Sequence, residues 1–155
     1  MEKQHKVQCY AAPLEGITGY IYRNAYWRHF PDVDKVYAPF LQPNQKRVLA
    51  PKEERDILPE NNPGIPLVPQ VLTCSADGFK RAVHALEAYG YQEVNLNLGC
   101  PSGTVVAKKR GAGFLSVPDE LDEFFAQIYE NELLADKKAG YQDDISFVGS
   151  LYTDR

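Results

Sequence analysis

Short apolar runs alternate with segments of helical spacing along most of this chain, and this alternation constrains the fold more than any other feature. Runs that predict strands occupy residues 7–12, 35–40, 66–72 and 93–98. Strands that alternate with helices are typical of a parallel sheet, because each parallel connection needs a long crossover. The sequence therefore predicts an α/β fold, as a parallel sheet or a (β/α) barrel.

The connecting segments carry start and stop signals for helices. Thr18 is a candidate N-cap for a helix over about 19–29, and Ser75 is expected to cap a helix that Gly90 closes. Pro118, followed by two acidic residues, predicts the start of a last helix with a single apolar face.

Three stretches are less regular. Residues 42–64 are polar and predict an extended loop, or a loop with a short helix at 51–57. Pro69 argues against an unbroken central strand, although irregular strand ends in barrels tolerate proline. Near the end of the chain, 145–151 could form one more strand.

Composition indicates a soluble globular domain. Of the 155 residues 44% are apolar and 25% are charged, and the net charge of −4 excludes an overall basic surface for nucleic acid. The cysteines have no paired spacing, the N-terminus is polar and no apolar run reaches transmembrane length, so we expect a cytoplasmic protein with reduced thiols and no membrane segment. The histidines lack metal-ligand spacing, so no metal site is expected.

Cys100 lies in the most informative segment, directly after a predicted buried strand. Gly99 allows close approach of the backbone to a ligand, and Pro101 fixes a turn. Strand ends are where α/β folds collect their chemistry, so the thiol could act as a nucleophile or a proton donor. A buried structural cysteine is the alternative.

Polar side chains near other strand ends could join this thiol. Asn95 and Asn97 alternate and therefore share one face, which Gln70 of the preceding strand could also reach. Such amides can recognise a planar heterocycle, or they can simply hydrogen-bond neighbouring strands. Glu15 follows the first strand and could lie near the same mouth or on a surface loop.

A basic cluster at 108–110 precedes the glycines of 111–113. Basic residues with glycines can hold phosphates, although this segment does not match a P-loop. A solvated loop is the usual explanation for such a cluster.

Together these pieces resemble the tRNA-dihydrouridine synthases, flavin enzymes that fold as a (β/α) barrel of TIM type. The resemblance covers about residues 7–130, and the order of its motifs is the family's order. The matching segments are Ala12-Pro13-Leu14-Glu15-Gly16-Ile17-Thr18, Val68-Pro69-Gln70-Val71 and Asn95-Leu96-Asn97-Leu98-Gly99-Cys100-Pro101-Ser102, followed by Val106, Lys108 and Gly111-Ala112-Gly113-Phe114-Leu115.

The resemblance implies a chemistry. FMN would lie at the C-terminal mouth of the barrel, NADPH would reduce it, and a uracil flipped out of tRNA would receive hydride at C6. Cys100 matches the family cysteine that protonates C5 as a general acid. Asn97 matches an asparagine in the flavin and uracil region, and Gln70 matches a ligand of the flavin ring. Further candidates are Pro13, Leu14 and Glu15 beside the flavin, and Asn95, Lys109 and Arg110 for the tRNA substrate.

The resemblance also divides the chain. Residues 1–130 correspond to the N-terminal half of the barrel, and 131–155 form a divergent tail that carries no counterpart of the family's Lys-x-Arg pair. Half a barrel has unpaired sheet edges and an exposed inner face. We therefore expect the chain alone to bind FMN weakly or not at all and to self-associate.

Two other functions remain open. The chain could be a non-catalytic remnant or an interaction fragment. It could also belong to another flavin barrel that reduces a double bond in a small molecule. The spacing of Asn97 and Cys100 favours the uridine enzyme.

Overall fold

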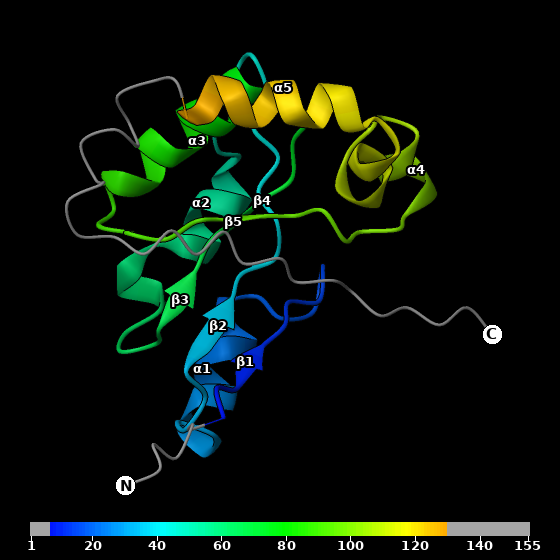
Figure 1. Ribbon diagram of the computed structural model, residues 1–155. Helices are drawn as coiled ribbons and strands as arrows, with labels where there is room; N and C mark the ends of the chain where they lie inside the picture. The colour runs from blue at the N-terminus through cyan, green and yellow to red at the C-terminus, as the bar shows by residue number, and fades with distance from the viewer. Residues whose placement is uncertain (1–6, 130–155) are drawn as a thin grey trace, which may run out of the picture.

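A computed structural model describes residues 7–129, which form an α/β fold with parallel strands (Figure 1). The α/β prediction is therefore confirmed, while the tail at 131–155, with the strand expected at 145–151, lies outside the described residues. The strands, all short, are β1 (Tyr10–Ala11), β2 (Lys35–Tyr37), β3 (Leu67–Val68), β4 (Gln70–Val71) and β5 (Asn95–Leu96).

Pro69 divides the third predicted strand into β3 and β4. The first of these pairs with β2, and the second pairs with β5. The Pro69 carbonyl still accepts a hydrogen bond from the Asn95 N–H at 2.9 Å. A bridge between Leu41 and Val71 links the two small sheets, so the strand positions follow one another in sequence order.

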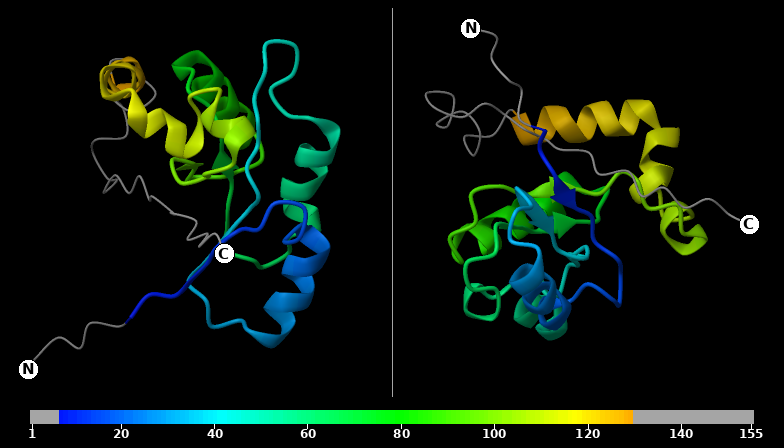
Figure 2. Two further views of the ribbon diagram at one scale, coloured as in Figure 1. Left: turned by 90° about the vertical axis from the view of Figure 1, so that its right-hand side faces the viewer. Right: turned by 90° about the horizontal axis from the view of Figure 1, so that it is seen from below.

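The helices form two groups, which Figure 2 shows apart from each other. Two of them, α1 and α2, lie beside β1 and β2, whereas α3 packs against α5, with the Phe79 and Phe124 rings 5.8 Å apart. The helical elements are α1 (Tyr20–His29), α2 (Pro51–Ile57), α3 (Ala76–Glu87), α4 (Gly103–Val106) and α5 (Pro118–Tyr129), with 3₁₀ turns η1 (Pro59–Asn61) and η2 (Gly111–Ser116).

Two apolar clusters lie between the strands and these helix groups. The first joins the strands to α2 and α3 through Ile57 and Leu86, and the second joins β5 to η2 and α5 through Leu96, Phe114 and Phe124. Burial of each such side chain contributes about 1.5–3 kcal/mol. Because Leu96 of β5 and Leu98 just after it belong to the core, Asn95 and Asn97 point to the opposite, inner face.

The helix ends differ in part from the expected caps. Ser75 caps α3, since its Oγ accepts the Gly78 N–H at 3.2 Å. Gly90 has φ +87°, and the hydrogen bonds from Gly90 to Glu87 and from Tyr91 to Leu86 form the Schellman pair expected of a C′ glycine.

The prediction that Thr18 caps α1 was wrong. Its Oγ1 accepts the Leu14 N–H at 2.7 Å, inside the turn that precedes the helix. The first helical N–H, that of Tyr20, instead donates to Asp56 Oδ1 of α2 at 2.7 Å. A partner 36 residues away in sequence provides this cap, so no local pattern could predict it.

Candidate functional site at the strand ends

Three buried amide side chains meet at β4 and β5: Gln70 of β4, Asn95 of β5 and Asn97, which directly follows β5. Gln70 Nε2 donates to Asn95 Oδ1 at 2.8 Å, and Asn97 Nδ2 donates to Gln70 Oε1 at 2.8 Å. Their residues are 2%, 0% and 7% exposed for Gln70, Asn95 and Asn97. The structure thus brings together the three amides that the sequence placed on one face, and it pairs them with one another.

The amide of Asn97 also shapes the turn that carries Cys100. Its Oδ1 accepts the Gly99 N–H at 3.1 Å and the Cys100 N–H at 2.9 Å, which is the geometry of an Asx turn. Cys100 is a free, half-buried thiol. A continuous series of hydrogen bonds therefore runs from Asn95 to the backbone of the candidate proton donor.

The segment after Cys100 folds back against it through two glycines. The Ala112 N–H donates to the Cys100 carbonyl at 3.0 Å. Gly111 has φ +54°, and a Cβ there would lie 2.6 Å from that carbonyl oxygen, while a Cβ on Gly113 would lie 2.6 Å from the Val106 carbonyl oxygen. The close packing of η2 on α4 and on the Cys100 turn needs glycine at both positions.

The basic cluster lies on this folded segment. Lys109 forms a half-exposed ion pair with Glu120 of α5, with Nζ and Oε1 2.5 Å apart. Arg110 is half-buried, and its Nε is a buried donor without a hydrogen-bond partner among residues 7–129. The Arg110 guanidinium therefore has unused donor capacity.

Pro13, Leu14 and Glu15 lie in the turn between β1 and α1. The Leu14 carbonyl accepts the N–H groups of Ile17 and Thr18 at 3.0 Å, which closes the turn. Glu15 is exposed, and partial burial of its carboxyl raises its pKa above the ordinary value, against the opposing effect of Lys52. Glu53 and Asp56 raise this pKa further, by a smaller amount.

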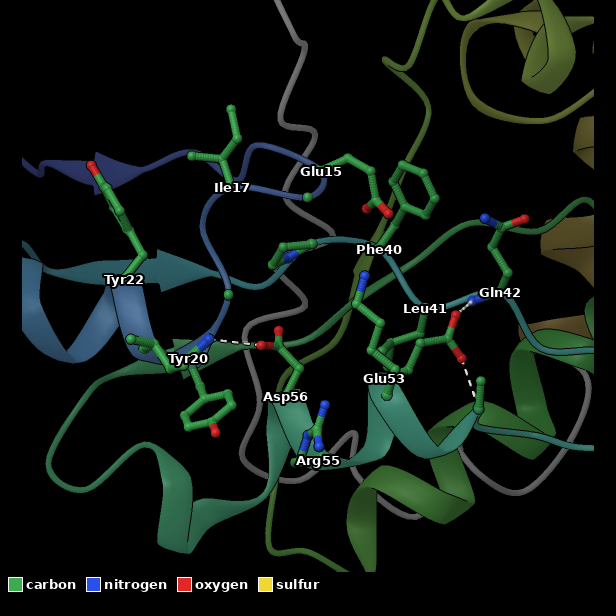
Figure 3. A pocket seen from close by; sticks show the side chains of 16 residues that line it. Glu15, Ile17, Tyr20, Tyr22, Phe40, Leu41, Gln42, Glu53, Arg55 and Asp56 are labelled. Atoms are coloured by element: carbon green, nitrogen blue, oxygen red, sulfur yellow. Dashed lines mark hydrogen bonds between the residues drawn. The ribbon is translucent and has the colours of Figure 1, made fainter.

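A cavity of about 430 Å³ opens beside this turn (Figure 3). The segments after β1 and β2 line it together with α2, and Figure 3 shows the Glu15 carboxyl beside the Phe40 ring. Among the predicted site residues within 7–129, only Glu15 lines it. The site residues therefore lie in two regions. Pro13, Leu14 and Glu15 share the turn beside this cavity, and the amides lie at β4 and β5 with Cys100, Lys109 and Arg110 on the segment that follows.

A buried arginine supports the cavity, and no sequence pattern indicated this role. The Arg23 side chain is 1% exposed and pairs with Asp56, with Nη1 and Oδ2 2.9 Å apart. It also donates to the Thr18 carbonyl at 2.8 Å and to Asn62 Oδ1 at 3.0 and 3.1 Å. Arginine is rarely buried without a partner. Two side-chain partners of Arg23, Asp56 and Asn62, lie in the stretch that the sequence predicted to be a polar loop.

Comparison with known proteins identifies the family. The model of the dihydrouridine synthase family matches residues 10–132, which is most of the chain and includes every candidate site residue. The chain belongs to the dihydrouridine synthase family. The resemblance on which the sequence prediction rested is confirmed.

Curated dihydrouridine synthases are similar to this chain over part of their length. The tRNA-dihydrouridine synthase B of Serratia marcescens is 29% identical over 109 residues, which are 70% of this chain and 32% of that protein. The tRNA-dihydrouridine(16) synthase of Neisseria meningitidis serogroup A is 28% identical over 154 residues, covering 92% of this chain and 45% of that protein. The matches therefore cover from about a third to just under half of the length of these relatives.

Two kinds of feature are absent from residues 7–129 of this dihydrouridine synthase chain. Within residues 7–129 no helix is long and apolar enough to cross a membrane. The same residues contain no group of three or more His, Cys, Asp or Glu side chains that could hold a metal ion.

Proposed function

We propose that this chain is the N-terminal part of an enzyme that reduces uridine to 5,6-dihydrouridine in tRNA. The observation that carries the proposal is the family match over residues 10–132, which includes the Asn97–Cys100 turn at a strand end. The parallel strands with helices between them agree with the first half of a (β/α) barrel of TIM type. The cytoplasm, where tRNA is modified, is the proposed location.

Cys100 is the proposed general acid. A thiol that donates a proton to carbon must be held close to that carbon and must be partly accessible to it. The Asx turn fixes the backbone of Cys100, and its half-buried side chain meets the second requirement. In this function Cys100 gives its proton to C5 of the uracil.

The donor set near Cys100 fits the ring system of FMN. Gln70 and Asn97 have amide groups whose second donor and acceptor positions suit the polar edge of an isoalloxazine. The 13–15 backbone follows β1, at the end of the first strand. FMN, reduced by NADPH, would supply the hydride to C6. The chain's own contribution there is to hold the ring and to exclude water.

tRNA is the proposed partner, held through local charge. Lys109 and Arg110 lie on the segment that follows Cys100, so phosphates near a flipped uridine would lie within reach of them. The unpartnered Nε of Arg110 supports this assignment, and Asn95 stays a candidate for a substrate contact. Lys109 would have to exchange Glu120 for a phosphate, which an exposed ion pair permits at little cost.

We also infer that the chain alone self-associates and binds FMN weakly. Among residues 7–129, strands β1 and β5 each have a neighbour on one side only, and unpaired parallel edges favour pairing with another chain. Size-exclusion chromatography with light scattering and a flavin titration test this. A monomer that binds FMN stoichiometrically would contradict it.

The function is tested in a strain that lacks dihydrouridine. We expect the complete open reading frame containing this chain to restore dihydrouridine, measured by mass spectrometry of tRNA nucleosides, and Cys100→Ala to abolish it. Cys9→Ala is the matched control, because Cys9 is an exposed thiol outside the site. Failure of the unsubstituted protein, with or without added FMN, would favour a non-catalytic remnant.

A further inference from the structure

The three amides at β4 and β5 have only one possible set of orientations. Asn97 Oδ1 faces two backbone N–H groups, at Gly99 and Cys100, so its Nδ2 must face Gln70. Gln70 must then present Oε1 to Asn97, which leaves Nε2 to donate to Asn95 Oδ1. The backbone donors of the turn thus determine the direction of every bond in the series.

Burial makes this series sensitive to the loss of any one member. With Gln70 and Asn95 2% and 0% exposed, water does not replace a missing partner. Without the Gln70 carboxamide, the Asn97 Nδ2 group would be a buried donor without an acceptor, which is costly. Asn97 would relieve that cost by rotating, and rotation removes its Oδ1 from the Gly99 and Cys100 amides.

An exposed turn at Asn44 shows what burial changes at the Asn97 turn. Asn44 Oδ1 accepts the Lys46 and Arg47 N–H groups at 3.0 and 2.9 Å, with the same sequence spacing as at Asn97. Asn44 is exposed, so water can hydrate its amide when the turn opens. The turn at Asn97 lacks this alternative, and its stability depends on the neighbouring amides.

We propose that Gln70, oriented by Asn95, is a positioning residue that acts through Asn97 to hold the Cys100 turn in one conformation. The consequence for catalysis rests on the proposed role of Cys100 as proton donor, whereas the effect on the turn does not. In this account Asn95 acts on the turn by orienting Gln70, and that role does not depend on its candidate contact with a substrate.

The first experiment uses the full chain without flavin or tRNA. Hydrogen exchange at the Gly99 and Cys100 amides is compared between the unsubstituted chain and Gln70→Leu, which has similar size and no polar group. We expect protection of both amides to fall about three- to tenfold, the range for loss of one hydrogen bond. Asn44→Ala, the matched control, should change exchange at Lys46 and Arg47 and leave the Cys100 turn unchanged.

Thiol labelling gives a second measure in the same samples. Alkylation of Cys100 is followed by peptide mass spectrometry relative to exposed Cys9, with half-buried Cys74, whose Sγ lies 3.6 Å from the Lys108 carbonyl oxygen, as the internal control. We expect Gln70→Leu to raise labelling of Cys100 about three- to tenfold and that of Cys74 by less than about twofold. An equal rise at both thiols would show general loosening and would overturn the proposal.

Gln70→Glu provides a pH-dependent readout that a side chain with only a space-filling role would not produce. It also tests the proposal if Gln70→Leu does not fold. A protonated carboxyl can donate to Asn95 and accept from Asn97, as the amide does, whereas a carboxylate cannot donate. Burial raises the pKa of such a carboxyl. We expect protection of the turn near that of glutamine at low pH, and loss of protection as the pH rises.

The proposal fails if exchange and labelling in Gln70→Leu match the unsubstituted chain, or if Gln70→Glu shows no pH-dependent change at the turn. These readouts need neither cofactor nor substrate. The variants could therefore change the turn as expected while the complementation test yields no dihydrouridine. That result would contradict the proposed function and leave this inference standing.

Discussion

The strand ends of this protein are held by two different kinds of interaction. At β4 and β5, neutral amides pair with one another and with the backbone of the Cys100 turn. At β1 and β2, the buried Arg23–Asp56 ion pair holds α1 against α2 beside an open cavity. Neutral amides can be buried completely once they are hydrogen-bonded to one another. A buried ion pair differs, because loss of either partner leaves an uncompensated charge and strongly destabilises the fold.

The two regions therefore have different structural roles. The β4–β5 region is suited to hold a reactive group in one conformation, because each of its bonds depends on the next. The β1–β2 region keeps space open between Glu15, Phe40 and α2 (Figure 3), and its charges support the walls of that space. Substitutions in the two regions should therefore differ in size and in pH dependence.

Loss of the buried arginine should have the largest effect. Arg23→Met leaves Asp56 without its partner and removes the bonds to Thr18 and Asn62, so we expect the free energy of unfolding to fall by about 3–5 kcal/mol. Urea unfolding followed by Trp27 fluorescence measures it. Arg81→Met, which removes a partly exposed pair with Asp77 and a hydrogen bond to the Asn44 carbonyl, is the control and should cost about 1 kcal/mol or less. Equal effects of the two substitutions would contradict the structural role of the ion pair.

A methyl group at Gly113 tests the packing on the Cys100 side. Its Cβ would lie 2.6 Å from the Val106 carbonyl oxygen and 2.7 Å from the Val106 Cα, and backbone atoms cannot move aside easily. We expect Gly113→Ala to cost about 1–3 kcal/mol in the same unfolding assay. Gly103→Ala in α4 meets nothing within 4 Å and should be neutral or slightly stabilising. A neutral Gly113→Ala would show that η2 is not packed closely on α4.

Tyr91 links α3 to the ion-pair region and predicts an alkaline effect. Its hydroxyl donates to the Ile57 carbonyl, and burial raises the pKa of the Tyr91 phenol to about 12. A raised pKa means that the folded state retains the proton longer, so stability falls as the pH rises from about 10 through 12. Tyr91→Phe should cost about 1 kcal/mol at neutral pH and should lose less stability over that alkaline range.

Unfolding midpoints measured across that pH range test this prediction. Tyr22→Phe, which replaces an exposed tyrosine of α1, is the control. An alkaline decline that is identical in Tyr91→Phe and in the unsubstituted chain would contradict the assignment to Tyr91.

The smallest effect is expected at Glu15. Burial raises the pKa of its carboxyl, so its contribution favours the folded state most when it is protonated and is lost as the pH rises through the raised pKa. Glu15→Gln should flatten the pH dependence of the melting temperature between about pH 4 and 7. Lys52→Met should steepen it, because Lys52 opposes the shift. A Glu15→Gln variant that does not flatten this dependence, or a Lys52→Met variant that flattens it, would place Glu15 outside the cavity's electrostatic environment.

Much of the fold was predictable from local patterns. All four apolar runs contain strands, and the Ser75 cap and the Gly90 C′ position followed from residue preferences that act within one turn. Pro69 was predicted to interrupt a strand. The sequence did not predict that the interruption produces two short strands that pair with different neighbours. The cap of α1 was missed because it comes from Asp56.

The sequence by itself determined where the chemistry gathers. A thiol and amides at the ends of successive strands, in the family's order, are local facts, and the parallel arrangement brings such ends to one edge. Only the tertiary structure decided what these groups do to one another: that Gln70 and Asn95 pair through Asn97 with the Cys100 turn, and that Arg23 is buried against Asp56. Hydrogen-bond partners of buried polar groups depend on which distant elements exclude water from them, and no local pattern encodes that.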